Sequence, residues 1–297
     1  MHIQLLERVR LIQLITHNYI NGIAGGLSRS KHRGSGFEFD QIREYQPGDD
    51  IRFIDWHGSA RSNKLLVKQY HEEKSRSIML CVDGSESGCY TSGTVRKYDV
   101  FVSLAIVLAL AAQVSNDAVG LIVFTDKIEL YIPAVKGLDH VKLIINKLSV
   151  YEPNGKTDIA RASKFIIDLG KRDLFTFFIS DFIQPSFDAC AYLAFFQYLR
   201  AKGDLVSLIY ADQYESIFPT VGYLDLQDSE THQNSTFYFE RRAKNVISDV
   251  LASRSQSVIE NFVRSGIDYL SFDDTLIHDY AFIPKLVSFF AQRGMHH

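Results

Sequence analysis

Residues 77–88 read Ser-Ile-Met-Leu-Cys-Val-Asp-Gly-Ser-Glu-Ser-Gly, and this stretch decides the fold. Its first half, Ser77–Val82, is short and mostly apolar, as in a buried β-strand. Its second half is an Asp-x-Ser-x-Ser sequence, followed by small residues that lead toward a helix. A strand that runs directly into such a polar loop is typical of open parallel sheets, in which ligands bind beyond the carboxyl ends of the strands.

Strands and helices continue to alternate from this stretch to the C-terminus. Strands as apolar as Leu174–Ser180 are buried on both faces, which indicates a parallel sheet covered by helices. We therefore expect an α/β fold that is doubly wound around a mostly parallel sheet. The predicted helices are Lys97–Val114, Leu138–Leu148, Thr157–Leu169, Phe187–Lys202, Ala243–Arg264 and Leu276–Arg293, and the further strands are Ala118–Phe124, Ile128–Ile132, Leu205–Tyr210 and Ile267–Phe272.

Two regions depart from this alternation. The first is residues 1–76, where apolar residues at helical spacing over 4–20 predict an N-terminal helix. Short apolar pieces and turn signals between Phe37 and Gln69 predict a small β-rich lobe. The second region, from about 217 to 241, is polar and rich in turn residues, so we expect an insertion there. The predicted domains are therefore 1–76 and 77–297.

Composition excludes several classes of partner. The formal net charge is -3 and the pI is near 6.4, which gives no global electrostatic case for binding nucleic acid or an anionic membrane. The three cysteines form no Cys-x-x-Cys pair, which fits a reduced, cytoplasmic location. The most apolar run, Leu104–Val114, is about half as long as a membrane span, so we expect a buried helix and no direct membrane span.

Five oxygen-bearing side chains are expected to meet at the carboxyl edge of the sheet. Asp83, Ser85 and Ser87 lie on one loop, Thr157 opens a predicted helix, and Asp181 directly follows a predicted strand. Two carboxylates and three hydroxyls form an all-oxygen set of the kind that Mg²⁺ prefers, with Mn²⁺ or Ca²⁺ as alternatives. Each piece alone also has an ordinary interpretation, since Asp and Ser are common in turns and Thr is a common helix N-cap.

The five positions resemble the metal-ion-dependent adhesion site of the von Willebrand factor type A (VWA) fold, which is itself Rossmann-like. That site has Asp-x-Ser-x-Ser after the first strand, then a distant Thr and a distant Asp after the fourth strand. Asp83, Ser85, Ser87, Thr157 and Asp181 match it in identity and order. The resemblance implies that hydroxyls contact the metal, that the aspartates act directly or through water, and that a partner's carboxylate completes the coordination.

A second signature lies upstream of the predicted VWA domain. It reads Gly34-x-Gly36-x-Glu38-Phe39, then Arg43-Glu44-Tyr45-x-Pro47-Gly48-Asp49-Asp50-x-Arg52-x-Ile54-Asp55-Trp56, then Ala60-Arg61. This run closely resembles the bacterial domain-of-unknown-function family 58, whose members carry it just before a VWA domain. The resemblance implies a partnership with a MoxR-type AAA+ ATPase in the maturation or remodelling of an unknown client protein.

The charged residues of this signature have two interpretations. The favoured one is a salt-bridged network that fixes the lobe against the VWA domain, with Trp56 as its apolar anchor, because isolated surface ion pairs stabilise little whereas networks can fix geometry. The other is a partner-docking surface. The residues for which we consider docking are Arg43, Asp49, Arg52, Trp56 and Arg61.

Three functions remain open from the sequence. The favoured one is a metal-dependent protein-binding module without enzymatic turnover. A metal-dependent phosphohydrolase with Asp83 as nucleophile would require a second carboxylate two residues on, where Ser85 stands, and a nearby cation, for which Lys156 is the candidate. A scaffold that needs no metal is the third. No nucleotide-binding loop and no Ser/His/Asp or Cys/His triad can be defended.

Overall fold

The computed structural model describes residues 37–47, 49–62, 64–72, 76–92, 95–183, 191–211, 222–227, 234–239, 253–254, 256–273 and 281–295. The described residues fall into two compact units that divide between Arg76 and Ser77. The helix expected over residues 4–20 lies outside the described residues.

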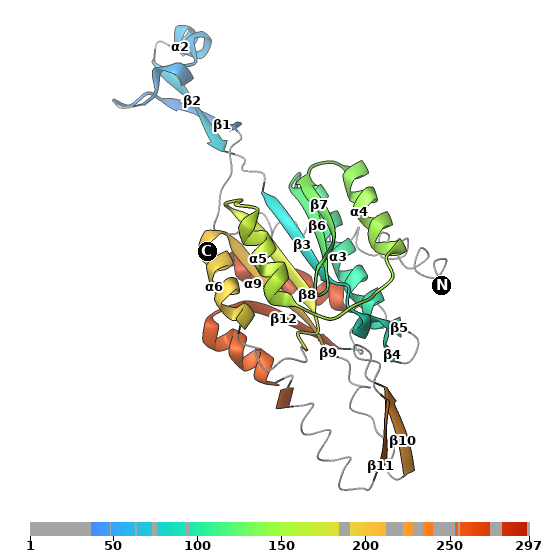
Figure 1. The fold of residues 1–297 in the computed structure, drawn as a ribbon. Coiled ribbons are helices and arrows are strands. Elements are labelled where there is room, and N and C mark those ends of the chain that lie inside the picture. The colour runs from blue at the N-terminus through green and yellow to red at the C-terminus, as the bar shows by residue number, and fades with distance from the viewer. Residues whose placement is uncertain are drawn as a thin grey trace. The chain divides into compact units, whose positions relative to one another are not determined.

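The larger unit is built on a six-stranded sheet in the order β12-β9-β8-β3-β6-β7 (Figure 1). Every neighbouring pair is parallel except β6 and β7, which are antiparallel. The chain winds outward from β3 in both directions, so the strand order reverses between β3 and β8. This topology confirms the predicted doubly wound α/β fold. The strands are β3 (Ser77–Asp83), β6 (Ala118–Phe124), β7 (Ile128–Val135), β8 (Leu174–Ser180), β9 (Asp204–Ala211) and β12 (Asp268–Asp273).

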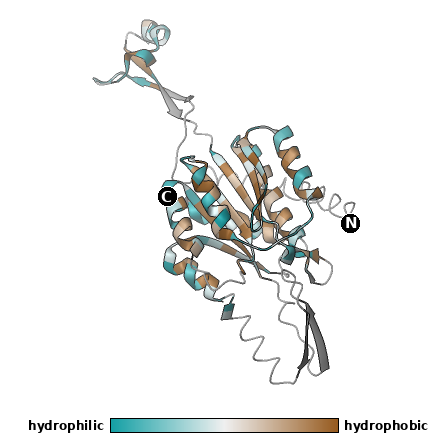
Figure 2. Ribbon diagram, in the orientation of Figure 1, coloured by the Kyte–Doolittle hydropathy of each residue, from teal (hydrophilic) through white to brown (hydrophobic). Residues whose placement is uncertain are grey.

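Helices cover both faces of this sheet, and each face has its own hydrophobic core. On one face, α3, α4 and α9 pack against the sheet; on the other, α5, α6 and the helical residues 256–265 do so. Figure 2 shows hydrophobic residues along the central strands, whereas the covering helices carry both hydrophobic and hydrophilic residues. The helices are α3 (Lys97–Val114), α4 (Leu138–Val150), α5 (Ile159–Asp168), α6 (Ala191–Lys202) and α9 (Phe282–Met295).

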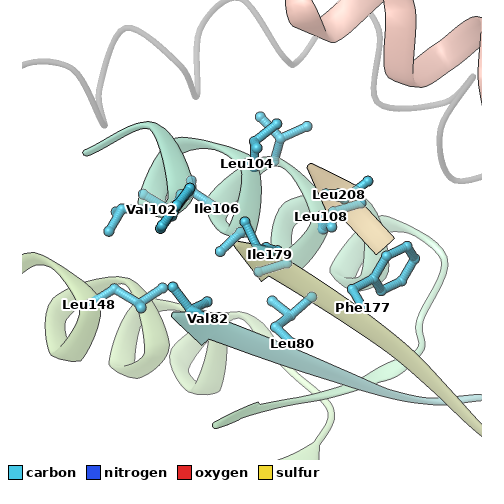
Figure 3. Packing of buried hydrophobic residues seen from close by; sticks show 14 of the residues in the cluster. Leu80, Val82, Val102, Leu104, Ile106, Leu108, Leu148, Phe177, Ile179 and Leu208 are labelled. Atoms are coloured by element: carbon cyan, nitrogen blue, oxygen red, sulfur yellow. The ribbon is translucent and has the colours of Figure 1, made fainter. Parts of the chain in front are cut away.

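Helix α3 lies inside the protein, as its apolar sequence predicts. Ile106 and Leu108 of α3 belong to one hydrophobic core with Leu80 of β3 and Phe177 of β8 (Figure 3). Full burial of one such side chain stabilises the fold by about 1.5–3 kcal/mol. Among the described residues, α3 is the one helix that is long and apolar enough to cross a membrane, and 83% of its 18-residue window is buried in the fold.

Several element boundaries differ from the sequence prediction for local physical reasons. Helix α5 begins at Ile159, because Asp158 is its N-cap and its side chain accepts a hydrogen bond from the amide of Arg161. Strand β7 continues through Pro133 to Val135, which an edge strand tolerates. Helix α9 contains Pro284 in its first turn, where amides have no intrahelical acceptor, so the helix is continuous from Phe282 to Met295.

The described part of the larger unit also contains two small sheets. In the region predicted to be an insertion, β10 (Gly222–Gln227) pairs antiparallel with β11 (Asn234–Phe239). The segment between β3 and α3 contains a 3-10 helix, η2 (Glu86–Cys89). It is followed by an antiparallel pair of short strands, β4 (Thr91–Ser92) and β5 (Val95–Arg96), which leads directly into α3.

The smaller unit is an antiparallel pair of strands with helical residues in the connection. Strand β1 (Phe37–Glu44) pairs with β2 (Leu66–Glu72), with a register shift between Phe39 and Gln41. Between the strands lie a 3-10 helix, η1 (Ile51–Phe53), and a short helix, α2 (Trp56–Ser62). The expected β-rich lobe is therefore a two-stranded sheet with a largely helical connection.

Candidate metal centre

The site begins at Asp83, the last residue of β3 and almost fully buried. Its Oδ1 accepts a hydrogen bond from the amide of Ser85 at 3.0 Å, so the carboxylate closes a turn over the next two residues. The hydroxyls of Ser85 and Ser87 are 2.9 Å apart. The Asp-x-Ser-x-Ser spacing thus brings three oxygen-bearing side chains to one small loop.

Gly84 holds this loop close to its neighbours. Its amide donates to the carbonyl of Phe124, and its carbonyl accepts from the amide of Asn154 and the hydroxyl of Tyr151. A Cβ at this position would lie 2.6 Å from Cγ1 of Val123, so a larger residue does not fit without a shift. Glycine is therefore required here for close approach, and the loop is anchored to the end of β6 and to the segment after α4.

Thr157 reaches the same carboxylate from the chain segment before α5. Its Oγ1 lies 3.5 Å from Oδ2 of Asp83, at the outer limit of a hydrogen bond. The carbonyl of Gly155, a residue with φ of +71°, accepts from the amide of Glu86 and ties this segment to the Asp83 loop. Because Asp158 is the N-cap of α5, the Thr157 hydroxyl is directed to the site and does not cap the helix.

The end of β8 contributes both a predicted and an unpredicted residue. The hydroxyl of Ser180 donates to Oδ2 of Asp83 at 2.6 Å and accepts from the amide of Phe182. Asp181 follows, and its Oδ1 accepts from the amide of Ile183 at 3.0 Å. Asp83 and Asp181 therefore stand at the carboxyl ends of β3 and β8, where the strand order reverses and ligands bind in such sheets.

Lys97, the first residue of α3, is the second residue at the candidate site that was not predicted from the sequence. Its Nζ lies 2.7 Å from Oδ2 of Asp181, and the two side chains are only 2% and 4% exposed. The available signal was topological: a helix that follows β3 in a doubly wound sheet begins at the carboxyl edge. Lys156, the cation suggested by the sequence, is exposed instead.

The electrostatics of the site make it unfavourable for the carboxyls of Asp83 and Asp181 to be ionised together. Burial raises the pKa of the Asp83 carboxyl to about 6, and the negative charge of Asp181 adds to this effect. Hydrogen bonds from Ser180 and Ser85 act in the opposite direction, because they stabilise the ionised carboxylate. A cation placed between these residues would offset the unfavourable charge.

The donor set fits a hard divalent cation. Hydrogen bonds link Asp83, Ser85, Ser87 and Thr157, and the charge of Asp181 acts on Asp83. Two carboxylates and three hydroxyls suit Mg²⁺, which usually takes one or two carboxylates and retains waters. Within the described ranges no group of three or more His, Cys, Asp or Glu side chains gathers, and this site has two such side chains, Asp83 and Asp181, beside its hydroxyls.

The charged signature of the smaller unit forms local ion pairs. Arg43 donates two hydrogen bonds to Asp49, both at 2.7 Å. Arg52 pairs in the same forked manner with Asp50, its neighbour at the start of η1. Trp56 is 66% exposed and Arg61 is exposed. The residues considered for docking thus divide into an ordered pair, Arg43 and Asp49, and exposed side chains.

Comparison with known proteins identifies relatives over nearly the whole chain. The model of the family described as "Protein of unknown function DUF58" matches residues 41–256. An uncharacterised protein of Mycobacterium tuberculosis is 23% identical over 293 residues, which cover 98% of this chain and 90% of that protein. The uncharacterised protein YeaD of Bacillus subtilis is 26% identical over 153 residues, 51% of this chain and 35% of its own length.

Solved structures are also similar to this chain, and they include the following two. One is an aerotolerance-related membrane protein from Bacteroides fragilis, with a TM-score of 0.44 and 12% identity, covering 72% of this chain and 99% of that chain. The other is a von Willebrand factor type A protein from Catenulispora acidiphila, with a TM-score of 0.41 and 11% identity, covering 89% of this chain and 51% of that chain.

Proposed function

This chain belongs to the DUF58 family of proteins of unknown function, and we propose that it is a metal-dependent protein-binding module. The metal, Mg²⁺ or alternatively Mn²⁺ or Ca²⁺, would be held by Asp83, Ser85, Ser87, Thr157 and Asp181. The observation that supports the proposal is that hydrogen bonds link Asp83, Ser85, Ser87 and Thr157, and the charge of Asp181 acts on Asp83, at the edge where the strand order reverses. A carboxylate from the partner would complete the coordination.

The same proposal includes a partner and a place of action. The sequence resemblance supports a MoxR-type AAA+ ATPase as the binding partner and an unknown protein as its client, with the complex acting in the cytoplasm. The exposed Trp56 and Arg61, together with Arg52, offer a second contact surface on the smaller unit. We expect this chain to bind and to catalyse no reaction of its own.

A pull-down from the native lysate tests this function. The baits are wild type, the double variant Asp83→Ala with Ser85→Ala, and Ser207→Ala as a control buried on β9. We expect wild type and the control to retain an AAA+ ATPase in Mg²⁺ but not in a chelator. The double variant should retain none. Equal retention by all three baits with and without metal would instead identify a metal-independent scaffold.

One feature of the site favours the alternative function as a phosphohydrolase, and another argues against it. Lys97 supplies a buried cation at the site, which the sequence reasoning had sought in Lys156. Residue 85 is Ser, however, so the second carboxylate that such chemistry would place beside the nucleophile is missing. Turnover of phosphate esters by wild type that is lost in Asp83→Asn would replace the binding function with this one.

A further inference from the structure

Among the residues that the structure describes, three buried charged groups lie at the site. Asp83 and Asp181 are carboxylates, and Lys97 is an ammonium ion in direct contact with Asp181. A buried charge is costly unless an opposite charge or hydrogen bonds compensate it. With both carboxylates ionised, Lys97 compensates one of the two negative charges, and one negative charge remains for a ligand to neutralise.

A divalent cation would overcompensate this remaining charge. Two carboxylates, one ammonium ion and one divalent cation together carry one positive charge. A carboxylate from a partner would bring the total to zero. Without the ammonium ion, the metal and the two aspartates would already be neutral, and an additional carboxylate would add an uncompensated negative charge to a buried site.

We propose that Lys97 sets the charge of this site. Its positive charge weakens the binding of the metal when no partner is present, and it makes the bound metal select an acidic side chain of the partner. The inference rests on the metal-dependent function proposed above. Its position supports it: Nζ contacts Oδ2 of Asp181, while Oδ1 of Asp181 is taken by the amide of Ile183. The ammonium ion of Lys97 is therefore fixed beside the carboxylate of Asp181, with which the metal would also interact. Lys97 is a positioning residue: it acts through Asp181 and does not itself touch the acidic side chain of the partner protein.

Calorimetric titration of Mg²⁺ separates the two effects of Lys97. Wild type and Lys97→Met are each titrated in chloride and in acetate at equal ionic strength, with acetate as the probe for a partner carboxylate. Lys97→Met should bind Mg²⁺ about tenfold more tightly than wild type in chloride, because one positive charge is removed beside the metal. Acetate should tighten Mg²⁺ binding to wild type and have little effect on Lys97→Met.

Two further variants control for structural effects. Lys97→Arg retains the charge and should retain the acetate effect of wild type, which a purely structural role of the lysine would not predict. Lys142→Met removes an exposed lysine of α4 that pairs with Asp139, and it should behave as wild type. If Lys97→Met does not fold, Lys97→Gln carries the same test, since its amide can donate to Asp181 without charge.

The outcomes distinguish this inference from the function on which it rests. Equal Mg²⁺ affinity and an equal acetate effect in wild type and Lys97→Met would overturn the role of Lys97 and leave metal binding intact. Weaker Mg²⁺ binding by Lys97→Met in chloride would likewise overturn it. Absence of Mg²⁺ binding in every variant, including wild type, would overturn both this inference and the proposed metal dependence.

Discussion

At the scale of single residues, the orientation of Asp83 is the central feature of the site. Its Oδ1 accepts from the amide of Ser85, and its Oδ2 accepts from the hydroxyl of Ser180 and lies near that of Thr157. These donors come from the same loop, from the end of β8 and from the segment before α5. The carboxylate is therefore fixed by three parts of the chain before any ligand binds.

Ser180→Ala should test how much this fixation contributes. The variant removes the 2.6 Å hydrogen bond to Asp83 and leaves a buried carboxylate oxygen with weaker contacts. We expect a loss of about 1–3 kcal/mol in the free energy of unfolding, measured by urea denaturation. Mg²⁺ affinity should fall as well, because the ligand is less well oriented.

Ser207→Ala is the matched control for that experiment. Ser207 is equally buried on the neighbouring strand β9, and its hydroxyl has no hydrogen-bond partner among the described residues. Its replacement removes a buried polar group without breaking a bond, so stability should stay the same or rise. Equal losses in Ser180→Ala and Ser207→Ala would contradict a special role for the Ser180 hydroxyl.

The smaller unit supplies a prediction on pH dependence. The forked hydrogen bonds from Arg43 lower the pKa of Asp49 to about 2, and the backbone amide of Gln46 assists. A lowered pKa means that the Asp49 interaction stabilises the fold above pH of about 4, the usual range for Asp, and is lost as the pH falls through about 2. NMR titration of the side-chain carboxyl carbon should give this low value.

Arg43→Gln should return the Asp49 pKa toward its ordinary range, because the main cause of the shift is removed. Arg61→Gln, a change at an exposed residue of the same unit, should leave it low. An Asp49 carboxyl that titrates in the ordinary range in wild type would show that the forked pair does not persist in solution.

Five residues of the candidate site were predictable from the sequence, and the structure places two more beside them. Asp83, Ser85 and Ser87 follow from one local motif, and Thr157 and Asp181 complete its known pattern. Lys97 and Ser180 are 84 and 97 positions from the residues that they contact. Such contacts depend on the packing of α3 and β8 against β3, so a local sequence pattern does not predict them.

At the scale of the elements, the apolar strands and the periodic helices were predictable because each carries its own pattern. The boundaries of elements were less so. The start of α5 depends on whether Thr157 or Asp158 caps the helix, and both residue types are good N-caps. In the structure Asp158 is the N-cap of α5, and the hydroxyl of Thr157 lies near Asp83 at the candidate site. The extension of β7 past Pro133 likewise depends on its position as an edge strand, which the local sequence alone does not define.

Gly120 offers a test of the pairing between β6 and β7. A Cβ on Gly120 would lie 2.7 Å from the carbonyl oxygen of Ile132 and 2.8 Å from the amide of Ala134, both in the backbone of β7. Gly120→Ala should therefore destabilise the protein by about 1–3 kcal/mol through overpacking, measured as a lower urea midpoint. An unchanged midpoint would contradict the close approach of these two strands.

At the scale of the whole molecule, the two compact units should respond differently to metal. Saturation at a hundred times the dissociation constant stabilises a binding-competent fold by about 2.7 kcal/mol. We expect Mg²⁺ to raise the unfolding temperature of the larger unit, followed by circular dichroism. Trp56 is the single tryptophan of the chain and lies in the smaller unit, so its fluorescence reports on that unit alone.

The fluorescence transition of Trp56 should stay at the same temperature when Mg²⁺ is added. Asp83→Ala should abolish the shift in the circular dichroism transition and leave the fluorescence transition unchanged. A fluorescence transition that moves with Mg²⁺ by the same amount as the circular dichroism signal would contradict independent responses and show that the two units unfold together.

The most direct test of the central claim is the stoichiometry and affinity of Mg²⁺ binding, measured by calorimetry on wild type and on Thr157→Val. Valine keeps the branched shape of the threonine and removes only the hydroxyl near Asp83. We expect one Mg²⁺ per wild-type chain and binding weakened by about tenfold or more in Thr157→Val. No binding by wild type, or equal affinity in both proteins, would contradict it.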